Sequence, residues 1–151
     1  MGNMYVRPLL DQIRAAFPAM TLQLAGAHTG GVDGGEFHRH VDGKPWTDLD
    51  RAYIARRDDV LSFMATPHLV QILPAFLTVM VESGSNTGVP DTLLPTLNRT
   101  QKQFDELAAA LTEAQRAAVI AVLDHVAATE EGKLAAAARA AGERWKRWKP
   151  I

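Results

Sequence analysis

The sequence contains no cysteine, which excludes disulfide bridges, thiolate zinc sites and cysteine nucleophiles. Aromatic residues are also few, at 7% of the 151 residues, whereas alanine is used heavily. This mixture favours helices with small contact residues over a β-sandwich. No apolar run approaches the roughly 20 residues that a membrane-spanning helix needs, and the amino-terminal segment lacks the apolar centre of a signal peptide. We therefore expect a soluble, cytoplasmic protein without a membrane span.

The short motifs of common enzyme classes are missing as well. The stretch GGVDGG, residues 30–35, has neither the spacing of a dinucleotide fingerprint nor the Lys-Ser/Thr pair of a phosphate-binding loop. No Gly-x-Ser-x-Gly sequence provides the usual setting of an esterase serine. The sequence therefore indicates no catalytic residue.

Charge is nearly balanced, at −1, but it is unevenly distributed along the chain. Residues 1–132 carry 10 Lys/Arg and 16 Asp/Glu, a net −6, whereas residues 133–151 carry 6 and 1, a net +5. An acidic body argues against broad binding to nucleic acid and favours association with a basic protein. The basic carboxyl-terminal segment is a second candidate binding surface.

Helical spacing of apolar residues covers most of the chain. The sequence TEAQ at 112–115 is a capping box, and Thr66-Pro67 is another start signal. The helix after Thr66 is the candidate for a buried centre, with Leu73, Phe76 and Leu77 in its core and a kink at Pro74. The expected helices span about 8–17, 47–57 with Thr47 as the N-cap, 66–80, 100–111, 112–126 and 129–149.

The last expected helix, about 129–149, combines an apolar seam with basic residues. The seam has spacings of 4, 3, 4 and 3, which place it along one side of a helix. This pattern predicts that the helix packs on the core with its cationic side chains in solvent. The seam consists of Leu134, Ala138, Ala141, Trp145 and Trp148.

Residues 20–45 form a glycine-rich insert that interrupts the helical pattern. The alternation in MTLQLAG places Met20, Leu22 and Leu24 on one face, and EFHRHV alternates again between Asp-Gly pairs at 33–34 and 42–43. These features predict a β-hairpin. We therefore expect a mainly α, single-domain bundle over 1–151, with about five to seven helices and a small N-terminal β-hairpin.

Two interpretations of the second expected strand remain open. On a strand, Glu36, His38, His40 and Asp42 share one face and could bind a metal in a small metal-dependent enzyme. Alternatively, Phe37 and Val41 point into the core and the polar set faces solvent. We favour the second interpretation and expect neither a bound metal nor another cofactor.

Several hydrophobic motifs run through the middle of the chain: Trp46 with Leu49, LSFM at 61–64, LPAFL at 73–77, and then Phe104, Leu107 and Gln115. This set resembles a family of small uncharacterised bacterial proteins that is classed only as a domain of unknown function. The resemblance covers about 40–125 and includes neither the glycine-rich insert nor the basic tail. It implies a mainly helical single domain and supplies no active-site residue.

These observations favour a non-catalytic protein-binding module, such as an immunity or inhibitor protein that neutralises a basic bacterial toxin domain. The metal-dependent enzyme is the first alternative, and an adaptor that binds through the basic carboxyl-terminal helix is the second. Trp46 has an alternative role as a hydrophobic staple for the helix expected after Thr47. The predicted partner-binding residues are Glu36, Asp42, Trp46, Asp48, Asp58 and Asp59.

Overall fold

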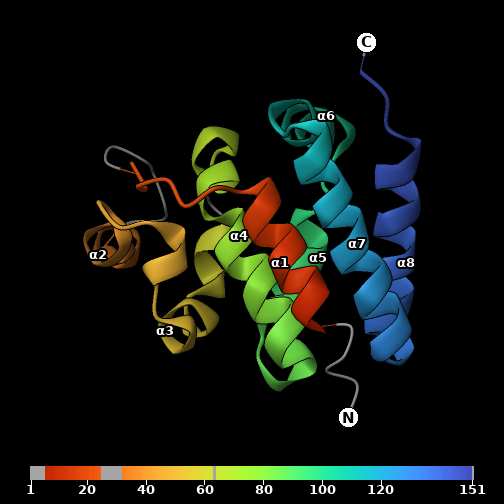
Figure 1. Ribbon diagram of the computed structural model, residues 1–151, viewed down its shortest axis with the longest axis horizontal. Coiled ribbons are helices and arrows are strands. Elements are labelled where there is room, and N and C mark those ends of the chain that lie inside the picture. The colour runs from red at the N-terminus through yellow and green to blue at the C-terminus, as the bar shows by residue number, and fades with distance from the viewer. Residues whose placement is uncertain (1–5, 25–31, 63, 151) are drawn as a thin grey trace.

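A computed structural model describes residues 6–24, 32–62 and 64–150. In this part of the chain there are eight α-helices, three 3-10 helices and no β-strand. Helices α2 and α3 lie at one end of the molecule and α7 and α8 at the other, with α4 between them (Figure 1). The elements are α1 (Val6–Ala16), α2 (Val32–Val41), η1 (Trp46–Asp48), α3 (Arg51–Arg56), η2 (Asp58–Ser62), α4 (Thr66–Ser83), η3 (Gly84–Asn86), α5 (Val89–Thr96), α6 (Gln101–Ala110), α7 (Glu113–Thr129) and α8 (Gly132–Arg147).

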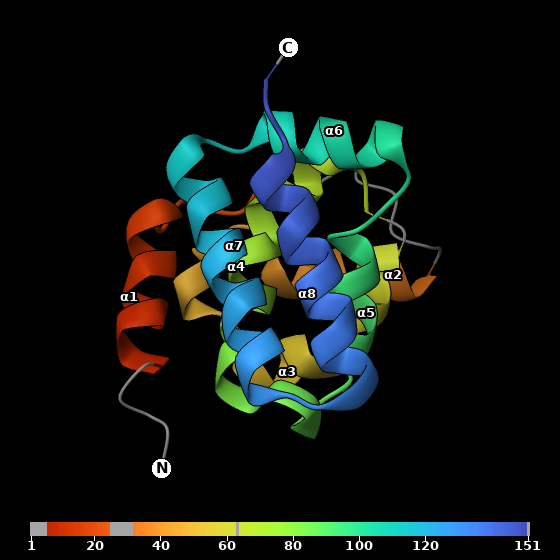
Figure 2. The ribbon, with the colours of Figure 1, turned by 90° about the vertical axis from the view of Figure 1, so that its right-hand side faces the viewer.

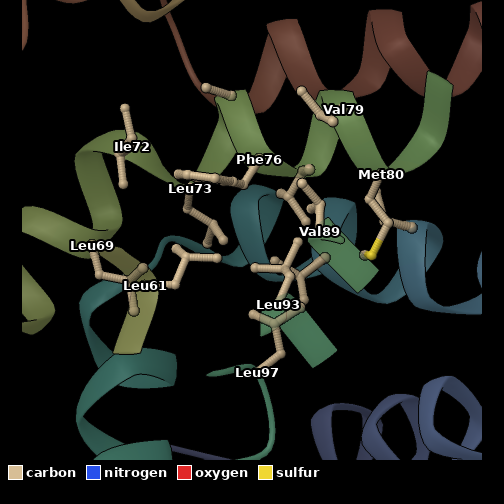
Figure 3. Close-up of a cluster of buried hydrophobic side chains, with 14 of the residues drawn as sticks. Leu61, Leu69, Ile72, Leu73, Phe76, Val79, Met80, Val89, Leu93 and Leu97 are labelled. Carbon is tan, nitrogen blue, oxygen red and sulfur yellow. The ribbon is translucent and has the colours of Figure 1, made fainter. Parts of the chain in front are cut away.

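Helix α4 is the central element, and it contacts α1, α3, α5, α6 and α7. Every residue from 72 to 81 is buried, because this helix is apolar on all sides and is surrounded by other helices. Leu73, Phe76 and Leu77 are each 0% exposed, as the sequence predicts. Side chains of α4 gather with Val89 and Leu93 of α5 in one hydrophobic cluster (Figure 3).

Pro74 lies inside α4 and has no N–H, so it leaves the carbonyl group one turn earlier without its helical donor. The hydroxyl of Thr78 donates a 2.8 Å hydrogen bond to the Pro74 carbonyl oxygen in the buried interior. Thr78 is the only buried threonine of α4, and this bond gives its hydroxyl group a hydrogen-bond partner within the helix itself. A polar side chain is thereby accommodated in the core at little cost.

Helices α7 and α8 form a hairpin of two long helices joined by a short connection, as Figure 2 shows from the side on which α8 faces the viewer. The predicted capping box is present, since Thr112 Oγ1 accepts from Gln115 N and Gln115 Oε1 accepts from Thr112 N. Ala138, Ala141 and Trp145 of the seam are buried. The prediction that the basic helix packs on the core is confirmed, although α8 begins at Gly132 rather than at residue 129.

The predicted β-hairpin is wrong. Its second strand is the helix α2, and the described residues of its first strand make only an isolated bridge, between Thr21 and Pro45. Phe37 and Val41 are four residues apart, so a helix also places both on one face, and both are 0% exposed. The first residues of the insert pair with the turn after α2, through a 2.8 Å bond from Leu22 N to the Lys44 carbonyl oxygen. Residues 25–31 of the insert lie outside the described residues.

The number of helices and one helix start also differ from the prediction. The described residues contain eight α-helices rather than five to seven, because α2 was expected as a strand and no helix was expected over α5. Thr47 does not cap a helix: it lies in η1, and α3 begins after Asp50, whose side chain accepts a 3.0 Å bond from Ala52 N. An aspartate is at least as effective as a threonine at a helix N-cap, so Asp50 can take the role that was expected of Thr47.

Candidate functional site

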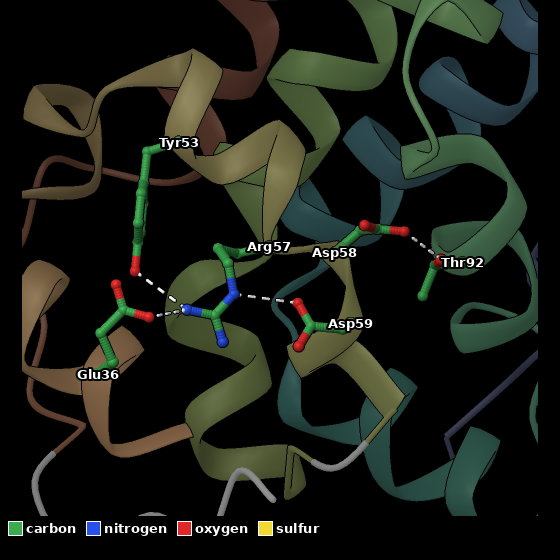
Figure 4. Close-up of polar contacts among 6 residues, drawn as sticks. All are labelled: Glu36, Tyr53, Arg57, Asp58, Asp59 and Thr92. Carbon is green, nitrogen blue, oxygen red and sulfur yellow. Dashed lines mark hydrogen bonds and ion pairs between the residues drawn. The ribbon is translucent and has the colours of Figure 1, made fainter. Parts of the chain in front are cut away.

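Arg57 brings two of the predicted binding residues together at the junction of α2, α3 and η2 (Figure 4). Its Nη1 lies 2.9 Å from Glu36 Oε2 and 3.2 Å from the Tyr53 hydroxyl, and its Nε lies 3.2 Å from Asp59 Oδ1. The guanidinium carbon also lies 5.7 Å from the centre of the Phe37 ring. Glu36 and Asp59 therefore share a largely buried arginine that fastens α2 to the rest of the protein.

The ionisation of this cluster follows from its contacts. Burial by itself lowers the pKa of Arg57, but the hydrogen bond and the negative charge of Asp59 outweigh that effect, and the pKa is raised. Burial raises the pKa of Tyr53, although the positive charge of Arg57 opposes the shift. Both groups therefore keep their protons at neutral pH, which suits a structural ion pair.

Three of the other predicted residues have structural partners. Asp42 Oδ1 accepts a 2.6 Å hydrogen bond from Leu24 N, and Asp58 Oδ2 accepts from the Thr92 hydroxyl on α5. Trp46 is 6% exposed, and its indole Nε1 donates a 2.9 Å bond to the Phe17 carbonyl oxygen. Trp46 is thus a core residue that anchors the end of α1, and it is neither a surface contact nor a staple for a helix at Thr47.

The last predicted residue, Asp48, is exposed in η1, but its surroundings are only weakly acidic. Residues 33–59 carry seven Asp/Glu and five Lys/Arg, a net −2. Residues 82–131 carry eight Asp/Glu and three Lys/Arg, a net −5. Most of the acidic excess of the body therefore lies between the end of α4 and the start of α8 rather than around the predicted hairpin.

The metal interpretation depends on a strand face that the protein does not form. On the helix α2, Glu36 and His40 lie one turn apart, whereas His38 falls on another side. The His40 ring stacks on Tyr53 with 3.6 Å between ring centres, and Asp42 follows the helix and is bonded to Leu24. Within the ranges that the structure describes, no group of three His, Asp or Glu side chains could hold a metal ion.

A cleft that the sequence did not predict lies between the start of α4, α5 and α6. Its volume is about 840 Å³, and η2, the α5–α6 connection and these helices supply its lining. The charged or titratable residues in the lining are His68, Asp91, Arg99 and Glu106. Sequence reasoning missed them because they come from three helices and the connection between α5 and α6, and none belongs to a recognised motif.

The positive side of the cleft is formed by Arg99. Its Nη2 donates a 2.8 Å hydrogen bond to the Leu61 carbonyl oxygen, and no carboxylate of the described residues forms an ion pair with it. Burial lowers its pKa, because the partly desolvated charge lacks an acidic partner that would compensate. A guanidinium cannot be deprotonated at neutral pH, so Arg99 keeps a charge with unused hydrogen-bonding capacity.

His68, in the first turn of α4, also lines the cleft. Its Nδ1 is buried and has no hydrogen-bond partner in the described part of the protein. Asp91 and Glu106, by contrast, are exposed carboxylates on α5 and α6. The lining of the cleft therefore combines two acidic side chains with a cation and an imidazole.

The architecture is that of a mainly helical protein, and no helix in the described residues is long and apolar enough to cross a membrane. The model of a family of unknown function, DUF6714, matches residues 7–150, so the chain belongs to this family. The match confirms the resemblance to an uncharacterised family and extends it beyond 40–125, to both the insert and the basic tail. No curated protein and no solved structure matched the chain.

Proposed function

We propose that this protein is a non-catalytic binding module that recognises a basic protein, and that the open cleft between α4, α5 and α6 is its recognition surface. The observation that carries the proposal is the position of the cleft. Asp91 and Glu106 line it, and both belong to the segment, residues 82–131, that holds a net charge of −5. Acidic side chains at a concave site attract a basic partner and accelerate its association.

The biological role that fits such a module is inhibition of a basic enzyme, as by the immunity protein of a bacterial toxin. An inhibitor needs a rigid surface of complementary charge and no catalytic group of its own. The rigid support is provided by η2, α4 and α5, whose apolar side chains form the cluster that includes Leu61, Leu69 and Leu93. A metal-dependent enzyme is not proposed, because the residues expected to bind the metal do not share a strand face. These residues are Glu36, His38, His40 and Asp42.

A second candidate function is an adaptor that binds through the outer face of α8. Its inner face is buried at Ala138 and Trp145, whereas Lys133, Arg139 and Arg147 are exposed. Packing of the helix on the core therefore leaves a cationic surface available for an acidic partner. This surface lies on a different element from the cleft, so variants can separate the two proposals.

The experiment begins with affinity capture of partners from a lysate of the source cells and purification of the partner. Association rates are then measured at low and high salt. Asp91→Lys with Glu106→Lys should slow association about tenfold or more at low salt and reduce its salt dependence. Asp11→Lys with Asp48→Lys is the matched control, because it makes the same charge change at exposed residues outside the cleft.

The pattern of rates decides between the surfaces. The proposal is wrong if the cleft pair leaves the rates unchanged while the control pair slows them, since Asp48 belongs to the surface near η1. It is also wrong if Arg139→Glu with Arg147→Glu abolishes binding and the cleft pair does not, because α8 is then the functional surface. Circular dichroism of each variant establishes that its helices are retained.

A further inference from the structure

The hydrogen-bond donors in the cleft determine what kind of group it can accept. We propose that the cleft binds a carboxylate carried by a positively charged peptide segment, with Arg99 and His68 holding the carboxylate and Asp91 and Glu106 holding the adjacent positive charge. This inference rests on the proposed function, because the segment belongs to the basic partner. It adds the chemical group that the cleft selects.

Arg99 is suited to a carboxylate for a geometric reason. A guanidinium has five N–H groups in a planar fork, and two parallel donors match the two oxygens of a carboxylate. One nitrogen of Arg99 is held by the Leu61 carbonyl oxygen, which fixes the orientation of the side chain beside the cleft. No carboxylate of the described residues forms an ion pair with Arg99, so an incoming carboxylate would complete the hydrogen bonding of a partly buried cation.

His68 supplies an imidazole at the same site. Its Nδ1 is buried without a partner, and a buried N–H without an acceptor is rarer in proteins than a buried lone pair. Because Nδ1 is enclosed by the protein, Nε2 is the ring nitrogen that we assign to the ligand. His68 lines the cleft together with Arg99, so the two side chains can act on one ligand.

The acidic residues restrict the ligand further. Arg99, Asp91 and Glu106 give the lining a net charge of −1 when His68 is neutral. An isolated carboxylate or a phosphate dianion would be repelled by the two acidic side chains, whereas a carboxylate beside a lysine or arginine would satisfy both signs of charge. The cleft has a volume of about 840 Å³, which is sufficient for a few residues of peptide.

The test uses short peptides as probes and the full-length protein. Acetyl-Gly-Lys-Lys-Gly with a free carboxyl terminus is compared with its carboxyl-terminal amide, with acetyl-Gly-Ala-Ala-Gly and with inorganic phosphate. Binding is followed by nuclear magnetic resonance of the Arg99 Nε–H and His68 ring signals. The free acid with lysines should shift these signals and bind about tenfold more tightly than its amide, the expected effect of losing one charge-assisted contact.

Two further arms identify the source of the carboxylate and the residue that holds it. A comparison of the affinities of acetyl-Lys-Asp-Lys-amide and acetyl-Lys-Asn-Lys-amide tests whether the cleft binds a side-chain carboxylate in place of a chain terminus. Arg99→Lys should remove most of the preference for the free acid, because a lysine cannot form the paired contact. Arg116→Lys is the matched control, since Arg116 is another half-buried arginine that donates to backbone carbonyls but lies outside the cleft.

Equal binding of acids and amides, or equal effects of Arg99→Lys and Arg116→Lys, would overturn the carboxylate site. In that case lysine peptides can still bind through Asp91 and Glu106, and the proposed basic partner then survives without this inference. Tighter binding of phosphate or of the alanine peptide than of the lysine acid would also overturn it, since the acidic residues would then play no part. Failure of the proposed function is recognised separately, from unchanged protein association in the variant with both acidic residues reversed.

Discussion

The indole Nε1 of Trp145 donates a 2.7 Å hydrogen bond to the carbonyl oxygen of Leu97. This contact joins α8 to the connection between α5 and α6, 48 residues earlier in the chain. The same indole packs edge-on against Phe104, with 5.2 Å between ring centres. One side chain thus links the carboxyl-terminal helix to the two helices that carry the acidic residues of the cleft.

Replacement of Trp145 by phenylalanine should lower the free energy of unfolding by about 1–3 kcal/mol, because the Leu97 carbonyl oxygen loses its buried donor. Trp148→Phe is the control: Trp148 is only partly buried, and Arg116 lies over its ring at 4.8 Å. We expect that change to cost less than about 1 kcal/mol. Urea unfolding followed by circular dichroism measures both values, and equal costs would show that the hydrogen bond contributes little.

Phe76→Ala should lower the free energy of unfolding by about 3–5 kcal/mol, the range for removing a large buried side chain from a packed core. Phe76 is 0% exposed in the centre of α4. Met20→Ala serves as the control, since Met20 is 72% exposed and its truncation should cost no more than about 0.5 kcal/mol. A small effect at Phe76 in urea unfolding would mean that α4 is not the centre of the core.

Arg57→Met should loosen α2 more than the rest of the protein, because the ion pairs to Glu36 and Asp59 and the bond to Tyr53 are lost together. Amide hydrogen exchange should therefore accelerate in α2 while α4 stays protected. Arg56→Met is the control, because Arg56 is the exposed neighbour. Uniform acceleration over the whole chain would indicate a global loss of stability instead.

Asp42→Lys and Asp58→Lys should each lower the melting temperature, although exposed carboxylates can usually be reversed with little effect. Asp42 accepts from Leu24 N and Asp58 accepts from the Thr92 hydroxyl, and a lysine can accept neither bond. Asp48→Lys, at an exposed residue of η1, should leave the melting temperature nearly unchanged. Calorimetry of the three single variants tests this order, and three equal melting temperatures would contradict it.

Acid should destabilise the protein partly through His125. Burial lowers its pKa below the ordinary value of 6.5, although the charge of Glu130 opposes the shift. The folded state therefore binds the proton less readily than the unfolded chain, and stability falls as the pH drops from about 6.5 toward the folded-state pKa.

His125→Gln removes this titrating group and should reduce the loss of stability between pH 7.5 and pH 5. The measurement is urea unfolding of both proteins at the two pH values, so that carboxylates common to both cancel in the comparison. An identical pH dependence in the variant would show that His125 makes no contribution. The imidazole signals in nuclear magnetic resonance give the folded-state pKa directly.

Local sequence determined much of the helical framework. The capping box at Thr112 and Gln115, the buried run around Phe76 and the seam that contains Trp145 were all predicted and are all present. These features depend on residues within one or two helical turns of each other, where spacing and capping are sufficient. The sequence also contained the family resemblance, which the match over residues 7–150 confirms.

Only the tertiary structure decided the conformation of residues 32–41 and the location of the cleft. Phe37 and Val41 suit one face of a strand or of a helix equally well, and contacts with Tyr53 and Arg57, distant in sequence, accompany the helical form. His68, Asp91 and Arg99 occupy unremarkable positions in separate segments and line one cleft only because α4 packs against α5 and α6. A binding site made from such segments depends on long-range packing, which local periodicity does not encode.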